Sequence, residues 1–129
     1  MTPANSFSVE TTGTLLVGSD IAAALTTLEH LPVDVVGLNC ATGPDLMQES
    51  VRHLGRHCTR PVMVMPNAGL PRNVGGHAVY DLTPAELGRF QRRFVSEDGV
   101  AIIGGCCGTT PEHVAAMVEA VQGLVPRDR

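Results

Sequence analysis

The chain has 129 residues, of which 43% are hydrophobic and 17% are charged, and its formal net charge is -4. This balance predicts one soluble globular unit, and no segment approaches the roughly 20 apolar residues of a membrane span. Nine arginines without a lysine leave no basic stripe for nucleic acid and exclude a Schiff-base lysine and a P-loop.

The N-terminus and the cysteines indicate the cellular compartment. Met1 to Ser8 lacks a cationic segment followed by an apolar core, so no secretory signal is predicted and we expect a cytoplasmic protein. Four cysteines in such a chain favour thiols or a metal site over disulfides, because the cytoplasm is a reducing compartment.

The first half of the chain predicts two strand–helix units. A short strand over 7–11 precedes a helix capped by Ser19-Asp20, whose apolar stripe includes Leu25. A nearly continuous apolar strand over 33–40 precedes a second helix. That helix enters at Pro44-Asp45, and its apolar stripe consists of Met47, Val51 and Leu54.

Two further units follow in the second half. A third strand over 61–66 and a glycine-rich loop lead to a capping box at 83–86, which begins a third helix. A fourth strand over 99–106 leads to another helix start at 109–112. We expect these two helices to bury Leu87, Phe90 and Phe94, and Val114, Val118 and Val121, respectively.

Strands that are apolar throughout belong to parallel sheets covered by helices, so the predicted class is α/β. Four consecutive βα units build either an open sheet or part of a (β/α)₈ barrel, and both folds place active sites at the carboxyl ends of strands. A full barrel needs about 250 residues, so this chain is long enough for half of one.

Three cysteines are predicted to share one end of the sheet. Cys40 ends the second strand, and Cys106 and Cys107 end the fourth, where flanking glycines permit the bend that neighbouring side chains need to converge. Three thiolates with an open fourth position are typical of catalytic zinc. Two alternatives stay open, namely small buried hydrophobic residues and a strained vicinal disulfide of a redox protein.

Other polar residues give weaker signals. The Asn67 amide follows a strand and either faces the metal or substrate or stabilises its own turn, and Asn39 is a candidate to brace Cys40 or its surroundings. Cys58 extends an apolar stripe and is predicted to lie in the core. His53 and His57 are expected on a solvated helix face, and His113 on the surface.

Three segments together resemble a known family. They are Gly37-Leu38-Asn39-Cys40-Ala41-Thr42-Gly43-Pro44, Met65-Pro66-Asn67-Ala68-Gly69-Leu70-Pro71 and the run from Gly104 to His113. In this order they are similar to the homocysteine-binding domains of cobalamin-dependent methionine synthases, within the wider zinc-dependent homocysteine S-methyltransferase family. The second segment is closer to the cobalamin-dependent branch than to the betaine-using one.

The resemblance implies a fold, an activity and partners. It covers strands five to eight of a (β/α)₈ barrel, so residues 1–125 are expected to form a partial homocysteine-binding domain and 126–129 a tail or the start of a linker. It also implies Zn²⁺ on Cys40, Cys106 and Cys107, homocysteine as substrate, and methylcobalamin on another domain or protein. The missing half-barrel and the cobalamin and folate domains, or self-association, would complete the chain.

The charge of the implied zinc site supports this chemistry. Zn²⁺ with three thiolates carries a charge of -1 and is a weak Lewis acid, but it still lowers the pKa of a bound thiol and leaves the sulfur nucleophilic. The expected function is therefore methyl transfer to homocysteine, giving methionine. The rival functions are a non-catalytic zinc-binding half-barrel or oligomerisation module and a thiol-redox protein.

Overall fold

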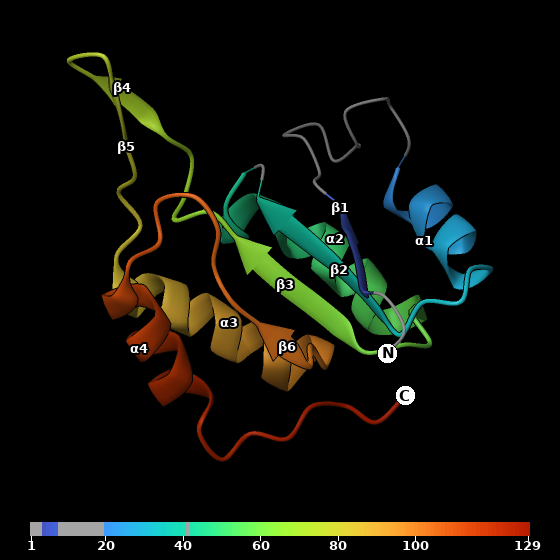
Figure 1. Ribbon diagram of the computed structural model, residues 1–129. Coiled ribbons are helices and arrows are strands. Elements are labelled where there is room, and N and C mark those ends of the chain that lie inside the picture. The colour runs from blue at the N-terminus through green and yellow to red at the C-terminus, as the bar shows by residue number, and fades with distance from the viewer. Residues whose placement is uncertain (1–3, 8–19, 41) are drawn as a thin grey trace.

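A computed structural model describes residues 4–7, 20–40 and 42–129, without the side chains of 4–7 and Cys40. Its centre is a parallel sheet in the order β1-β2-β3-β6 (Figure 1). These strands are β1 (Ala4–Phe7), β2 (Val35–Cys40), β3 (Val62–Pro66) and β6 (Ile102–Ile103). The expected first strand over 7–11 lies outside the described residues except for Phe7, and the strand that the structure shows lies just before it.

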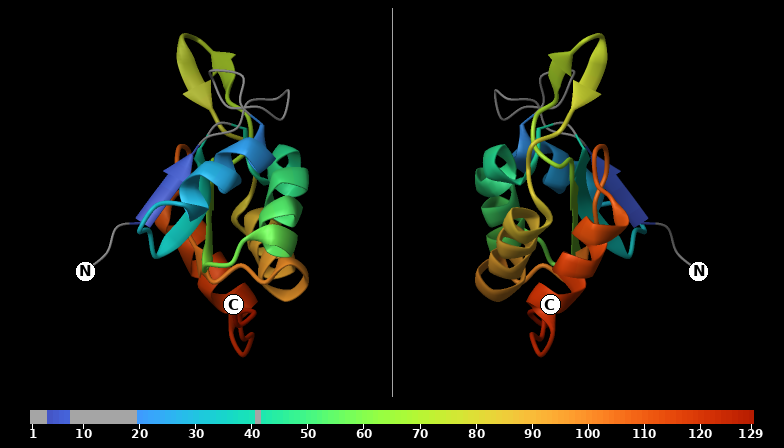
Figure 2. Two further views of the ribbon diagram at one scale, coloured as in Figure 1. Left: turned by 90° about the vertical axis from the view of Figure 1, so that its right-hand side faces the viewer. Right: turned by 90° about the vertical axis from the view of Figure 1, so that its left-hand side faces the viewer.

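The described part of the chain has four helices, which pack against one another in chain order. They are α1 (Ile21–Glu29), α2 (Pro44–His57), α3 (Pro84–Asp98) and α4 (Pro111–Val121). Asp20, Thr83 and Thr110 cap three of them through their side chains, and Pro44, Pro84 and Pro111 occupy the first helical turn, as the sequence predicts. Figure 2 shows α2 and α3 side by side against one face of the sheet, and α4 packs along α3.

The core lies between this face of the sheet and α2 and α3. Strand β3 alternates between buried Val62 and Val64 and half-buried Met63 and Met65, so its two faces differ in cover. Val36 and Leu38 of β2 are fully buried there and share one apolar core with Val51 and Leu54 of α2 and Phe94 of α3. The predicted stripe of α2 is therefore confirmed, and Cys58 lies in the same core, as expected.

The apolar stripe predicted for α4 is wrong. Val114 and Val118 are 49% and 55% exposed, whereas His113 and Met117 are buried against α3. Only Val121 of the expected stripe packs against the core, and it is partly buried. The helix is rotated because the His113 ring hydrogen-bonds inside the fold, which turns the stripe at positions 113, 117 and 121 inward.

Two further predictions differ from the structure. The fourth strand has regular ladder structure only at Ile102–Ile103, rather than over 99–106. The glycine-rich loop contains a hairpin, β4 (Arg72–Val74) and β5 (His77–Val79), that projects beyond the carboxyl ends of β2 and β3 (Figure 1). Gly75 and Gly76 both have positive φ, 58° and 83°, which allows the tight turn between its strands.

Two structural facts concern the outside of the molecule. No helix in the described part of the chain is long and apolar enough to cross a membrane.

The segment after α4 runs back along the amino-terminal side of the sheet, where Arg127 and Arg129 donate hydrogen bonds to the carbonyl oxygens of Gly55, Cys58, Glu97 and Asp98. These carbonyls belong to the last turns of α2 and α3 or follow them, so the tail joins the ends of the two helices.

Candidate metal centre

Cys106 and Cys107 lie in a tight turn that follows β6. The carbonyl oxygen of Cys106 accepts hydrogen bonds from the Thr109 amide at 3.2 Å and from its Oγ1 at 2.7 Å. Gly108, at the third position of the turn, has a φ of +78°, which favours glycine. The bend that the sequence predicts from flanking glycines is thus present just after the cysteine pair.

This turn brings the two sulfur atoms together. The Sγ atoms of Cys106 and Cys107 are 3.9 Å apart, Cys107 is exposed, and Cys106 is half-buried. Two thiolates on one tetrahedral zinc ion, each at about 2.3 Å from the metal, are about 3.8 Å apart. The pair therefore fits two corners of a zinc tetrahedron without rearrangement.

Strand β3 separates the cysteine pair from Cys40. In the β2–β3 register Cys40 is the partner of Pro66, and the Cys106 amide donates to the Pro66 carbonyl at 2.9 Å. The backbones of Cys40 and Cys106 therefore flank the same residue at the carboxyl ends of parallel strands. The Cys40 side chain lies outside the described residues, and among described side chains no group of three potential ligands gathers. Cys40 as a ligand stays a prediction.

The segment after β3 holds the cysteine turn in place. The Oδ1 atom of Asn67 accepts the Cys107 amide at 3.1 Å, and the Ala68 amide donates to the Cys107 carbonyl at 3.0 Å. Asn67 is 5% exposed, so this contact is shielded from water. One lone pair of the Asn67 oxygen is therefore used by the turn, while Asn39 is half-buried near the end of β2.

A chain of hydrogen bonds continues from this contact to α4. The Ala68 carbonyl accepts the Leu82 amide at 3.2 Å, and the Leu82 carbonyl lies 2.7 Å from Nε2 of His113. The other ring nitrogen, Nδ1, accepts the Thr110 amide at 3.2 Å, so the network assigns the ring proton to Nε2. His113 is only 7% exposed, and the expectation of a surface histidine is wrong.

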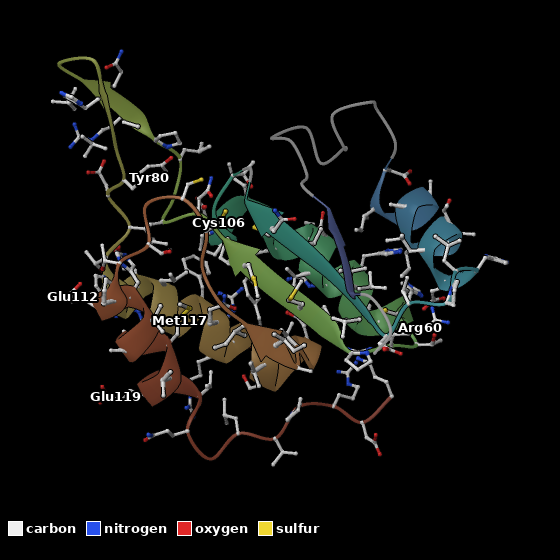
Figure 3. All side chains as sticks on the ribbon, in the orientation of Figure 1. Arg60, Tyr80, Cys106, Glu112, Met117 and Glu119 are labelled. Carbon is white, nitrogen blue, oxygen red and sulfur yellow. The ribbon has the colours of Figure 1, made fainter. Side chains whose placement is uncertain are left out.

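Tyr80 covers the other side of the turn. A Cβ atom added to Gly108 would lie 2.2 Å from Cγ of the Tyr80 ring, so the ring packs directly on the glycine. Tyr80 lies at the base of the hairpin, at the same end of the sheet as Cys106 (Figure 3). Next to it, the Arg72 guanidinium binds both oxygens of Asp81 and holds the pKa of that carboxyl below its usual range. The Tyr80 ring thereby joins the hairpin base to the Cys106–Cys107 turn.

The remaining titratable candidates lie elsewhere. Burial raises the pKa of the Cys58 thiol, and the nearby Glu29 carboxylate adds to that effect, so this cysteine is held as a neutral core residue. The rings of His53 and His57 on α2 have centroids 4.5 Å apart and are tilted by 41° to each other, and these residues are half-buried and exposed, respectively. The prediction of a core cysteine is confirmed, and the solvated helix face expected for the two histidines holds for His57, whereas His53 is half-buried.

Sequence reasoning missed residues that act through backbone contacts. His113 occupies the position where a capping box normally has Glu or Gln, and the pattern Thr-x-x-His was the available signal. Tyr80 gave no signal, because a ring that packs on a glycine leaves no periodic pattern. Gln91 also gave none, although its amide reaches the backbone next to the cysteines.

The chain is similar to proteins of known activity. The sequence profile of the family described as homocysteine S-methyltransferase matches residues 3–121. The methionine synthase of Mycobacterium tuberculosis is 52% identical over 122 residues, which cover 95% of this chain and 10% of that protein. The methionine synthase of Mycobacterium leprae is 52% identical over 124 residues, which cover 93% and 10%. The chain thus spans about one tenth of these relatives' length.

Solved structures agree with this grouping. The oxidized form of the homocysteine methyltransferase MmuM from Escherichia coli superposes with a TM-score of 0.68 and 25% identity, covering 90% of this chain and 35% of that one. The metallated form gives a TM-score of 0.65 and 24% identity, covering 88% and 34%. The α/β fold with a parallel sheet is therefore shared with about one third of a larger chain.

Proposed function

Because the chain belongs to the homocysteine S-methyltransferase family, we propose that Cys40, Cys106 and Cys107 bind zinc and that this site transfers a methyl group to the thiol of homocysteine, giving methionine. The observation that carries the proposal is the 3.9 Å separation of the Cys106 and Cys107 sulfur atoms, which suits a shared tetrahedral ion. A metallated form of a fold relative, MmuM, supports the metal.

The described residues give each part of the site a task. Bound zinc would lower the pKa of a thiol ligand and keep it a thiolate at neutral pH. The exposed position of Cys107 leaves the site open to a substrate thiol and to a methyl donor. Asn67 fixes the Cys107 backbone and keeps a second lone pair for the metal or the substrate. We propose methylcobalamin, carried by another domain or protein, as the donor.

We further propose that the four βα units are strands five to eight of a (β/α)₈ barrel. In the described part of the sheet, β6 pairs only with β3, so its other edge is open to a further parallel strand. The exposed Val114 and Val118 of α4 provide an apolar surface for a helix beside that strand. A closed barrel supplies both contacts, and homocysteine contacts from the other half would complete the site.

Cysteine variants test the metal site. We expect the chain to retain about one zinc ion after gel filtration. Replacement of Cys40, Cys106 or Cys107 by serine should weaken zinc retention by at least about tenfold, because each substitution removes a thiolate that binds the metal directly. Cys58→Ser is the matched control, since this cysteine lies in the core and should leave zinc content unchanged. Full zinc occupancy in a Cys106→Ser, Cys107→Ser double variant contradicts the proposal.

Substrate binding tests the activity. Homocysteine added to the zinc-loaded chain, together with a separately expressed half-domain carrying strands one to four, should add a fourth sulfur to the zinc-edge absorption spectrum. Calorimetry in two buffers of different ionisation enthalpy should report the proton that the thiol releases. If the complemented protein shows neither signal at millimolar homocysteine, the metal is structural and the methyltransferase proposal fails.

A further inference from the structure

Strand β3 lacks one backbone hydrogen-bond donor toward the segment that leads from β6 into the Cys106–Cys107 turn. The Gly104 amide donates to the Val64 carbonyl at 3.2 Å, and the Cys106 amide donates to the Pro66 carbonyl at 2.9 Å. In a parallel ladder the bonds alternate in direction, so the intervening Gly104 carbonyl faces the amide of residue 66. That residue is proline, which has no N–H, and the ladder therefore has a gap two residues before Cys106.

A side chain from α3 fills this gap. The Nε2 atom of Gln91 donates to the Gly104 carbonyl at 3.0 Å and to the Val64 carbonyl at 3.1 Å. The opposite amide orientation would place an oxygen against two carbonyl oxygens, so the hydrogen bonds themselves fix the assignment. Gln91 is 0% exposed, so no solvent molecule from the surface competes for these contacts.

The other end of the same amide argues against a role in stability alone. The Oε1 atom of Gln91 is buried and has no hydrogen-bond partner in the described part of the chain. An unpaired buried acceptor is destabilising, and a leucine or methionine of similar volume would remove it. What such a residue lacks is the pair of donors for Val64 and Gly104.

We propose that Gln91 is a positioning residue for the Cys106–Cys107 turn, because it replaces the backbone donor that Pro66 lacks and fixes Gly104 at the entrance to the turn. The inference rests on the zinc site proposed above. Without the bridge, the Gly104 carbonyl is free to rotate, and the two thiolates lose their fixed separation of 3.9 Å. Mutation of residues that orient metal ligands in this way typically lowers metal affinity about 10–100-fold.

A substitution and its rescue test this role. In Gln91→Leu, zinc affinity measured by competition with a chromophoric chelator should fall at least about tenfold. In Co²⁺-loaded protein, the thiolate-to-cobalt absorption should weaken as well. Adding Pro66→Ala restores an amide at residue 66, which can donate to Gly104 in the ordinary ladder. The double variant should therefore recover most of the affinity lost in Gln91→Leu, whereas a defect from altered core packing would persist.

Controls separate this inference from the metal site and from folding. Val51→Ala removes fully buried volume from α2, which carries none of the three proposed zinc ligands, and should lower the unfolding midpoint while leaving zinc affinity unchanged. Unchanged zinc affinity in Gln91→Leu, or a loss that Pro66→Ala does not recover, overturns the inference. A wild-type chain that binds no zinc overturns the proposed function instead.

Poor folding of Gln91→Leu still gives a decision. Gln91→Met keeps an unbranched side chain of similar length, and it is measured alongside. If either variant folds only when Pro66→Ala is also present, the bridge to Gly104 is supported. If both remain unfolded with Pro66→Ala, the role of Gln91 is packing and the inference is wrong.

Discussion

Glu29, at the end of α1, shows how one carboxylate joins two elements. Its Oε1 accepts hydrogen bonds from the Thr59 amide at 2.6 Å and from its Oγ1 at 2.9 Å, just before β3. Desolvation acts to raise the pKa of Glu29, but the hydrogen bonds from Thr59 outweigh it and the pKa is lowered. The ionised form is therefore the one that ties α1 to the start of β3.

The stability of the chain should depend on pH through this contact. A carboxylate whose pKa is lower in the folded state stabilises the fold above its unfolded pKa of about 4.3, and this stabilisation is lost as pH falls through the folded value. Glu29→Gln should lose less than about 1 kcal/mol at pH 6, because the site is largely exposed. Urea unfolding at pH 6 and pH 3.5 should show a smaller pH dependence in the variant. An equal dependence in both proteins contradicts this assignment.

At the same scale, sequence predicted the cysteine pair and its bend, because glycines beside two cysteines are a local signal. It did not predict Gln91, whose hydrogen bonds join residues 13 and 27 positions away. The only available trace was Pro66 in an apolar strand, which implies a missing donor but not which side chain replaces it. Nor did it reveal the burial of His113, because this depends on the distant Leu82 carbonyl.

Two helices of the chain begin with a capping box, but the two boxes differ in what they contact. Thr83 and Glu86 form a capping box at α3, and Thr110 and His113 form one at α4. The second box is also linked to the Cys106–Cys107 turn, since His113 binds the Leu82 carbonyl and the Leu82 amide binds the Ala68 carbonyl. The helix starts could be predicted because capping signals are local, whereas the rotation of α4 is set by that tertiary contact.

Matched substitutions at the two boxes should separate capping from positioning. Glu86→Gln and His113→Gln both leave a Thr-x-x-Gln box, which still caps the helix. His113→Gln removes the donor to the partly buried Leu82 carbonyl, which should destabilise the fold by no more than the about 1–3 kcal/mol of a fully buried unpaired group. We expect unchanged helix content by circular dichroism in both variants and lower zinc affinity only in His113→Gln. Equal zinc affinity in the two variants would show that the hydrogen bonds from His113 through Leu82 and Ala68 do not affect the position of the cysteines.

The elements that sequence missed share a cause. The β4–β5 hairpin has a Gly-Gly turn but short, exposed strands without apolar alternation, so no burial pattern marked it. β6 was predicted too long at both ends, and at its carboxyl end apolar residues alone do not show that Pro66 interrupts the ladder. Local signals thus predicted the order of elements in the four units, and non-local hydrogen bonds determined their ends.

The molecule as a whole leaves apolar surface uncovered. Ile102 on the edge strand is 38% exposed, and Val114 and Val118 on α4 are about half exposed. Met63 and Met65 are half-buried on the sheet face that α2 and α3 do not cover. In a barrel these positions would face other strands and helices.

The isolated chain should therefore self-associate. Val114→Glu with Val118→Lys replaces the apolar pair by an i,i+4 ion pair that preserves the helix, and it should shift the protein toward monomer in sedimentation experiments. Glu112→Lys with Ala116→Glu changes charges on α4 without removing a large apolar side chain, and serves as the control. A wild-type chain that sediments as a monomer at all concentrations would contradict this expectation.

The hydrogen bond between Gln91 of α3 and Gly104 also has an evolutionary consequence. Gln91 is needed only while residue 66 lacks an amide hydrogen, so the two positions are not independent under mutation. A lineage that replaced Pro66 first could then exchange Gln91 for an apolar residue, whereas the opposite order would pass through a weakened metal site. Among homologues, an apolar residue at the position of Gln91 should therefore occur mainly where the position of Pro66 is no longer proline. The chemistry of a zinc site would in this way constrain the order of substitutions in a helix that touches no ligand.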